Sequence, residues 1–318
     1  MTGIEGFHHV TSCVNGAQED IDFSTGVLGA SMIKQTVLLD GDHGVYHLYY
    51  ADPKASVGNV ITTFPYAQRG ITGRKGSGQV KNFALTVPEG SLNFWSQRFE
   101  RLGVESKSLE ERFGERVLPF LHPAGIGFEL VEAQDDERTP WTAAGVPVEQ
   151  AIRGLRSVTL SLRETDDMAG LMGELGFRET ASDGAYTRFE IGAGGPSRTV
   201  DFRHEPELAP GTWTYAAGTV HHVAFAVPDE EFQTQLKLHL EGLGYVDVSE
   251  IKDRNYFRSI YFRTPGGVLF ECATNGPGFT KDEPLETLGQ ELLLPEWYEG
   301  RREDLLNDLE PIAAPSGT

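Results

Sequence analysis

Apolar and polar positions alternate over residues 220–227 of the chain. Successive side chains of a β-strand point to opposite faces, so Val223, Phe225 and Val227 share one face. His222 and two alanines share the other face. We expect the bulky face to pack on a helix, which leaves His222 above small neighbours with open space beside it.

Helical patterns recur at the same spacing along the whole chain. Four amphipathic segments end on Leu-Gly, where a glycine suits the left-handed position after the last helical turn. The four glycines are Gly29, Gly103, Gly176 and Gly244. Their spacing of roughly seventy residues predicts one unit of a strand, a helix and further strands, repeated four times.

The repeat places the units and the individual elements. The predicted units run from about Gly6 to Tyr66, from Val80 to about Val131, from Leu155 to His204 and from Val220 to Cys272. Helices are predicted over 18–28 and over 92–102, the second with Ser91 as its N-cap. The acidic tail carries a short helical pattern over 301–309, which we interpret as a solvated surface helix, with packing over a cavity mouth as the alternative. Along the sequence we divide the chain into 1–145, 146–280 and the tail 281–318.

Candidate metal ligands occur at the ends of this repeat. The pair His8-His9 and the pair His221-His222 each precede a valine at a strand start, and Glu271 ends a short apolar run. The strand phase selects the second histidine of each pair as the one that faces the open side. A carboxylate on an apolar strand needs a partner, because an unpaired buried charge is costly. Two imidazoles and one carboxylate are typical of a non-haem iron site with open coordination positions.

The two middle units carry a degenerate version of this pattern. Asn82 and Ser157 occupy the place of His222, while Glu129 occupies the place of Glu271. If neighbouring units paired in sequence order, neither half would hold three ligands. If the first unit pairs with the fourth and the second with the third, His9 joins His222 and Glu271. We therefore predict the second pairing.

Composition narrows the class of ligand. The chain has 318 residues, a formal net charge of -20 and a pI of about 4.8, so nucleic acid and anionic membranes would be repelled. The sequence contains no run of about eighteen apolar residues, so no membrane span is predicted. Two cysteines, Cys13 and Cys272, are too few for a disulfide framework and fit the cytoplasm. We expect a cytoplasmic homo-oligomer that acts on a small molecule.

These residues resemble those of the vicinal oxygen chelate superfamily, whose α+β fold consists of βαβββ modules in barrel-like sheets. Within it the chain is similar to the ring-cleaving dioxygenases that act on hydroquinones. The resemblance is full-length; its motifs include His8-His9-Val10-Thr11, Tyr46-His47-Leu48-Tyr49, Thr62-Thr63-Phe64-Pro65, Trp213-Thr214 and Arg263-Thr264-Pro265-Gly266-Gly267. It implies four βαβββ modules and Fe(II), with Mn(II) as the other metal that the ligand set suits. The implied ligands are His9, His222 and Glu271, and the implied catalytic residues are His8, Arg254 and Tyr261.

The implied reaction uses O2 to open a dihydroxylated aromatic ring. The metal would bind the ring hydroxyl and O2 together. Tyr261 or His8 would supply a proton as the O–O bond breaks, and Arg254 would stabilise anionic charge. His8 conflicts with the strand phase, which turns it away from the open face. The pattern leaves hydroquinone and catechol both open as substrates.

Two other functions remain open at this point. A metal isomerase or lyase of the glyoxalase type would favour a fourth protein ligand, and Thr62 stands near the place of Glu271 in the first unit. A protein that only sequesters an aromatic compound would need no metal ligands.

Overall fold

Four copies of one strand-helix-strand unit build the molecule, as the repeat predicts. The computed structural model describes residues 3–40, 43–66 and 69–313. The first unit contains β1 (Gly6–Val14), α1 (Ala17–Ile21), the π-helical turn η1 (Asp22–Val27), β2 (Ser31–Val37), β3 (Tyr46–Ala51) and β4 (Val60–Pro65). The second contains β5 (Gln79–Pro88), α2 (Leu92–Leu102), β6 (Glu110–Arg112), β7 (Glu115–Leu121) and β8 (Gly127–Ala133).

The second half of the chain repeats the same order. The third unit contains β9 (Gly154–Leu162), α3 (Asp166–Glu174), β10 (Arg178–Asp183), β11 (Tyr186–Glu190) and β12 (Thr199–His204). The fourth contains β13 (Thr219–Val227), α4 (Glu230–Gly242), β14 (Lys252–Asp253), β15 (Arg258–Arg263) and β16 (Leu269–Thr274). Short helical segments are η3 (Ala143–Gly145), η4 (Phe279–Lys281), η5 (Leu285–Thr287), η6 (Glu296–Arg301) and α5 (Arg302–Asp308).

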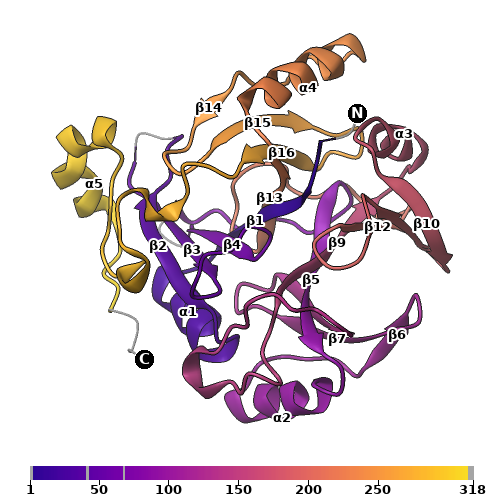
Figure 1. Ribbon diagram of the computed structural model, residues 1–318, viewed down its shortest axis with the longest axis horizontal. Coiled ribbons are helices and arrows are strands. Elements are labelled where there is room, and N and C mark those ends of the chain that lie inside the picture. The colour runs from indigo at the N-terminus through magenta and orange to yellow at the C-terminus, as the bar shows by residue number, and fades with distance from the viewer. Residues whose placement is uncertain (1–2, 41–42, 67–68, 314–318) are drawn as a thin grey trace.

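The strands form two curled sheets of eight strands each (Figure 1). The first has the order β14-β15-β16-β13-β1-β4-β3-β2, and the second β10-β11-β12-β9-β5-β8-β7-β6. The first and fourth units therefore share one sheet and the middle units share the other, which confirms the predicted pairing and the α+β fold. Each sheet combines strands from both halves of the sequence. The predicted division of the chain at residue 145 stays a prediction.

The units join through antiparallel strand pairs at the centre of each sheet. In the first sheet β1 pairs with β13, and in the second β5 pairs with β9. Val10, Val223 and Phe270 lie on the outer face of the first curled sheet and are fully buried in the main apolar core. The alternate positions His9, His222 and Glu271 converge on one another at the inner face of this curled sheet, the first barrel, which confirms the predicted strand phase.

The predicted helix ends are confirmed by the backbone. Gly29, Gly103, Gly176 and Gly244 all have positive φ, between 70° and 98°. The helix over 92–102 also agrees with α2, and Ser91 stands at its N-cap position as predicted, without a side-chain cap hydrogen bond. Its hydroxyl is buried and accepts no bond from the first turn.

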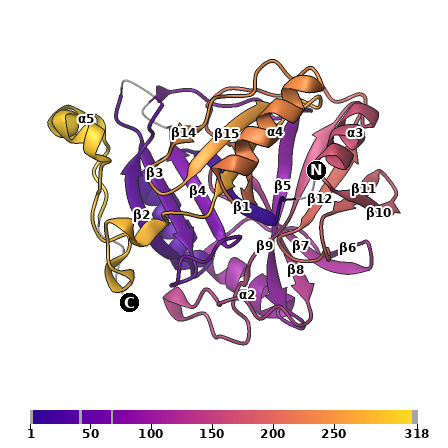
Figure 2. The same cartoon turned by 45° about the horizontal axis from the view of Figure 1, so that its top comes forward.

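The C-terminal segment lies against the first sheet and contains the predicted helix. It packs beside β2 at the edge of the first sheet (Figures 1 and 2). Helix α5 falls within the predicted range, but Leu305 is only 1% exposed and contacts Val37 and Leu294. Most of α5 is exposed, as a surface helix predicts, while Leu305 packs with Val37 of the edge strand β2. Among the described residues no helix is long and apolar enough to cross a bilayer.

Candidate metal centre

Three side chains from three adjacent strands of the first sheet converge at the inner face of the barrel. They are His9 on β1, His222 on β13 and Glu271 on β16. The Nε2 atoms of the two histidines lie 3.1 Å apart. Glu271 Oε2 lies 2.8 Å from His222 Nε2 and 3.5 Å from His9 Nε2. All three residues are buried, with 4% exposure or less.

Strand register explains why these residues meet. His9 pairs with Ala224, and Ala224 pairs with Glu271 on the next strand. Thr11 pairs with His222 on the same inner face. The small Ala224 and Thr11 lie between the bulkier side chains, so the ring nitrogens and the carboxylate can approach one another.

The first histidine of each pair contacts the second through its Nδ1 atom. Nδ1 of His8 lies 2.7 Å from Nδ1 of His9, and the same distance separates Nδ1 of His221 from Nδ1 of His222. A neutral imidazole has one N–H, so a ligand histidine that donates through Nδ1 keeps a bare Nε2. Two bare nitrogens and a carboxylate oxygen then face one another, an arrangement that a cation stabilises.

The carboxylate fits a cation for a second reason. Oε2 of Glu271 is buried and has no aligned hydrogen-bond donor, whereas Oε1 accepts a bond from the Ser259 hydroxyl. Burial alone would raise the pKa of Glu271, but the imidazoles of His9 and His222 hold it well below its usual value. Burial also lowers the pKa of His222, which favours the neutral, metal-binding imidazole. The residues therefore fit a divalent metal ion.

A cavity of about 250 Å³ lies over these three residues. Its wall is partly apolar, from Leu38, Leu39, Phe64, Phe257, Leu269 and Pro295. Its polar groups are Asp40, His47, Tyr215, His221, Lys252, Arg254, Tyr256 and Tyr261. A concave, partly apolar site with a few convergent polar groups is typical of a small-molecule site.

Arg254 and Tyr261 form one polar chain in this cavity. Arg254 Nε donates to the Tyr261 hydroxyl at 2.9 Å, and Arg254 Nη2 donates to Asp40 at 2.6 Å. Burial, and then the charge of Glu271, raises the pKa of Tyr261 well above its usual value. Tyr261 is therefore a neutral phenol whose oxygen accepts from Arg254, so its proton is available to donate.

The structure places His8 behind His9 and not among the residues that line the cavity. Its ring packs against His9 and Phe257, with centroids 5.0 and 4.8 Å away. Burial, together with the charge of His9, lowers the pKa of His8 to about 3. This position agrees with the strand phase.

His47 and Thr62 complete the inner face on the first unit. Thr62 pairs with Thr11 as Glu271 pairs with Ala224, so Thr62 holds the place of Glu271 in its own unit. The Thr62 hydroxyl lies 2.7 Å from that of Thr11 and 3.0 Å from His47 Nε2. The repeat could have found His47, because it precedes Tyr49 by two positions as Ser259 precedes Tyr261.

Loop residues of the cavity were missed. Asp40 lies in the loop between two strands, Tyr215 in the segment before β13 and Pro295 in the tail. The Tyr215 ring stacks on His221 with centroids 4.0 Å apart. No strand or helix period covers these positions, so the pattern carried no signal for them.

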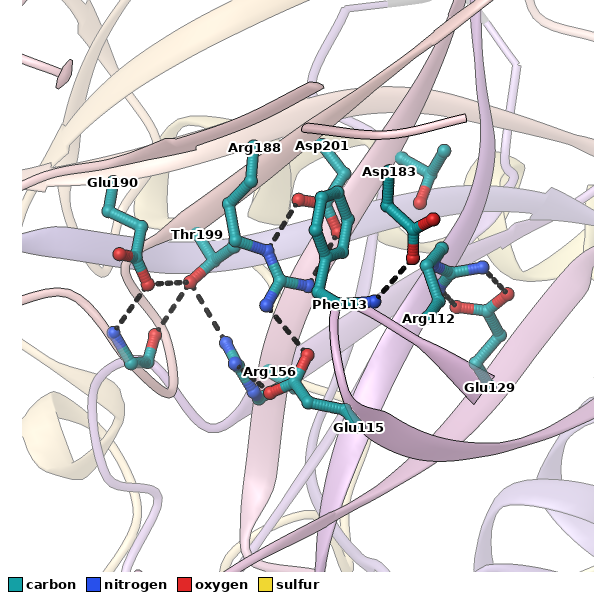
Figure 3. Close-up of polar contacts among 12 residues, drawn as sticks. Arg112, Phe113, Glu115, Glu129, Arg156, Asp183, Arg188, Glu190, Thr199 and Asp201 are labelled. Atoms are coloured by element: carbon teal, nitrogen blue, oxygen red, sulfur yellow. Dashed lines mark hydrogen bonds and ion pairs between the residues drawn. The ribbon is translucent and has the colours of Figure 1, made fainter. Parts of the chain in front are cut away.

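In the second barrel, ion pairs stand at the positions of the candidate metal ligands (Figure 3). Glu129 accepts two bonds from Arg112, and Asp201, at the matching position of the third unit, accepts two from Arg188. Asn82 stands in place of a histidine there. Over residues 3–40, 43–66 and 69–313, only His9, His222 and Glu271 form a group of three or more side chains able to hold a metal.

Comparison with known proteins shows full-length relatives. The chain is 40% identical over 313 residues to a chlorohydroquinone/hydroquinone 1,2-dioxygenase of Sphingobium indicum, covering 97% of both chains. It is 38% identical over 310 residues to MhqO of Bacillus subtilis, named as a candidate ring-cleaving dioxygenase, covering 96% of both. No family model matches the chain.

Solved structures agree with the fold. The crystal structure of a candidate dioxygenase from Bacillus subtilis superposes with a TM-score of 0.92 at 37% identity and full coverage of both chains. Glyoxalase I from Zea mays superposes with a TM-score of 0.63 at 14% identity, covering 85% of this chain and 92% of its own. The second likeness concerns the fold alone.

Proposed function

The chain belongs to the ring-cleaving dioxygenases of the vicinal oxygen chelate superfamily, and on that premise we propose that it opens hydroquinone-type rings with O2 at an Fe(II) ion. The observation that carries this proposal is the convergence of His9, His222 and Glu271 at the floor of the cavity. In the proposed reaction both oxygen atoms enter the product: one ring C–C bond and the O–O bond break. The cleaved carbons become a carboxylic acid and an aldehyde, so no external reductant is needed.

His9, His222 and Glu271 would hold the metal ion, and Mn(II) suits the same donors. When bound, a ferrous ion supplies open positions where a ring hydroxyl and O2 meet and through which electrons pass. His8 and His221 orient the ligand rings through the contacts at Nδ1. We assign His8 to this positioning role, since it does not line the cavity.

Tyr261 and Arg254 would act on the substrate itself. Tyr261 is the proposed proton donor as the O–O bond breaks, because burial keeps it protonated and Arg254 leaves its proton free. Arg254 is the proposed stabiliser of anionic charge on the ring oxygens. Asp40 fixes the Arg254 guanidinium from the other side.

The cavity suits a substituted ring. A dry cavity of about 150 Å³ holds benzene, whereas this one measures about 250 Å³. The Sphingobium indicum relative is named for chlorohydroquinone and hydroquinone. We propose a hydroquinone with a small apolar substituent, since the outer wall contains Leu38, Leu39 and Pro295.

Two rival functions have weaker support. A glyoxalase-type isomerase would favour a fourth ligand, but Thr62 fills that place and is hydrogen-bonded to Thr11 and His47. A non-catalytic binding protein would not need the buried carboxylate of Glu271. The cytoplasmic location and the homo-oligomer also remain proposals. Cys13 and Cys272, both buried and unpaired, are compatible with a reducing compartment.

The test is a substrate series with iron-loaded protein. Apo protein is loaded with Fe(II) without oxygen and then mixed in air with hydroquinone, methylhydroquinone, chlorohydroquinone or catechol. We expect one O2 consumed per ring-opened product with the hydroquinones. Turnover of catechol alone would overturn the proposed hydroquinone substrate. Absence of oxygen uptake with all four compounds would overturn the proposed dioxygenase function.

A further inference from the structure

The segment from Phe279 to Tyr298 runs along β2, the edge strand of the first barrel (Figures 1 and 2). Gln35 on β2 forms a parallel bridge with Leu292. Its carbonyl accepts from the Leu293 amide at 3.0 Å, and its side chain donates to the Gly289 carbonyl at 2.6 Å. The segment is therefore docked on the edge through backbone hydrogen bonds.

A buried lysine anchors the segment. Lys34 on β2 is 0% exposed, and its ammonium lies 2.8 Å from Asp282 and also binds Glu283. Burying an ammonium is costly unless partners compensate its charge. Both carboxylates come from the tail, so Lys34 has its two ion-pair partners when the tail is docked; without the tail, the Tyr256 ring 4.9 Å away would be the cation's remaining contact.

The outer part of the segment forms cavity wall. Pro295 is buried and lines the cavity, and its neighbour Leu294 packs on Val37. The Tyr298 hydroxyl donates to the carbonyl of Leu39, another lining residue, at 3.0 Å.

The inner part of the segment contacts two other lining residues, Tyr256 and Phe257. Asp282 accepts a bond from the Tyr256 hydroxyl at 2.9 Å. Phe279 and Leu288 pack in one apolar cluster with Tyr256 and Phe257. The Phe257 ring lies 5.4 Å from the ring of the candidate ligand His9, centroid to centroid. The tail therefore contacts the lining residues Leu39, Tyr256 and Phe257 and contributes Pro295 itself.

We propose that residues 279–298 are a built-in wall of the substrate cavity. Lys34 is a positioning residue that holds this wall through Asp282 and Glu283, and Pro295 is a specificity-determining residue that limits the ring substituent. The inference rests on the proposed function, because it concerns the same cavity.

The anchor is tested first by a readout that needs no activity. Lys34→Met keeps the length of the side chain but removes the charge, and Lys54→Met, at an exposed lysine, is the matched control. Trypsin cuts after Lys281, Arg301 and Arg302. In iron-loaded protein we expect the tail of the Lys34→Met variant to be cut at least tenfold faster than in the wild type and the control. An unchanged rate would overturn the anchor. Asp282→Asn, at a partly exposed partner, gives the same test if Lys34→Met does not fold.

The wall is tested by kinetics. For Lys34→Met we expect KM for hydroquinone to rise about tenfold with a smaller change in kcat, at unchanged iron content. For Pro295→Ala we expect kcat/KM for tert-butylhydroquinone, relative to hydroquinone, to rise at least fivefold. Pro311→Ala, in the exposed end of the tail, is the control. A ratio unchanged in Pro295→Ala would overturn its role in specificity.

The two proposals fail in different ways. If the wild type neither cleaves the two hydroquinones nor binds them in calorimetry without oxygen, the proposed function and the wall's role in binding both fall. The protease result would then still decide whether Lys34 anchors the tail. If the wild type cleaves hydroquinone and both variants behave as their controls do, only the further inference falls.

Discussion

The Nε2 atoms of His9 and His222 lie 3.1 Å apart although the two residues are 213 positions apart in the sequence. They meet because β1 and β13 pair antiparallel at the centre of one sheet. This contact joins the first and last units of the repeat and places the candidate metal site between them.

Replacing a proposed ligand should remove the metal. We predict that His222→Ala loses bound iron and ring cleavage together. The loss should exceed a hundredfold, since outer contacts of a metal site alone are worth about 10- to 100-fold. Iron content by metal analysis and initial rates of oxygen uptake measure it. His204→Ala, at an exposed histidine, should match the wild type. Full activity of His222→Ala would refute the assignment.

Replacing the proposed acid should keep the metal. Tyr261→Phe removes only the hydroxyl, so one iron per chain is expected, while kcat falls by about 10²- to 10⁴-fold, the usual contribution of general acid catalysis. Stopped-flow product formation measures the rate. Tyr186→Phe in the second barrel is the control. Loss of iron together with rate would mean that Tyr261 supports the site and is not its acid.

The ionised carboxylate of Asp40 should stabilise the folded protein at neutral pH and lose this effect in acid. Burial raises the pKa of Asp40, but the hydrogen bond and charge of Arg254 outweigh it and lower the pKa. A carboxyl with a lowered folded pKa stabilises above its unfolded pKa of about 3.9 and loses that effect as pH falls through the folded value. Since Asp40 is 35% exposed, we expect at most about 1 kcal/mol.

The measurement is urea unfolding of the wild type and Asp40→Asn between pH 7 and pH 3. The difference in unfolding free energy should be constant above about pH 4 and shrink below it. Glu207→Gln, at an exposed carboxylate, should show no such difference. A difference that grows on acidification would contradict the account.

The ion pairs of the second barrel should act on stability and leave the chemistry unchanged. Arg112 and Glu129 are 7% and 6% exposed, so Arg112→Met leaves a buried carboxylate unpaired and should cost about 3–5 kcal/mol. The double variant Arg112→Met/Glu129→Met should recover most of that loss. Urea unfolding measures both. A change in iron content of the double variant would show that this barrel takes part in metal binding.

Much of the site could be predicted from the sequence because it lies on strands. A period of two placed His9, His222 and Glu271 on one face, and the repeat matched Thr62 to Glu271. The pairing of the units followed from the requirement for three ligands. These inferences use positions whose direction the backbone determines.

The other residues of the cavity are placed by tertiary contacts that follow no periodic pattern in the sequence. Asp40 and Pro295 reach the cavity from a loop and from the tail, so their direction follows from tertiary packing. Lys34 is buried only because the tail covers β2, and an edge strand gives no sign of what will cover it. The burial of Leu294 and Leu305 could not be predicted for the same reason, because they are few apolar positions among many acidic residues.

The most direct test of the central claim is an anaerobic titration of apo protein with Fe(II), with the initial rate of oxygen uptake on hydroquinone measured at each point. The account predicts a rate that rises linearly to one iron per chain and then stays constant, because the second barrel has arginines in place of a metal. His222→Ala should stay at the baseline throughout. A plateau at two irons per chain, or full activity without metal, would contradict the account.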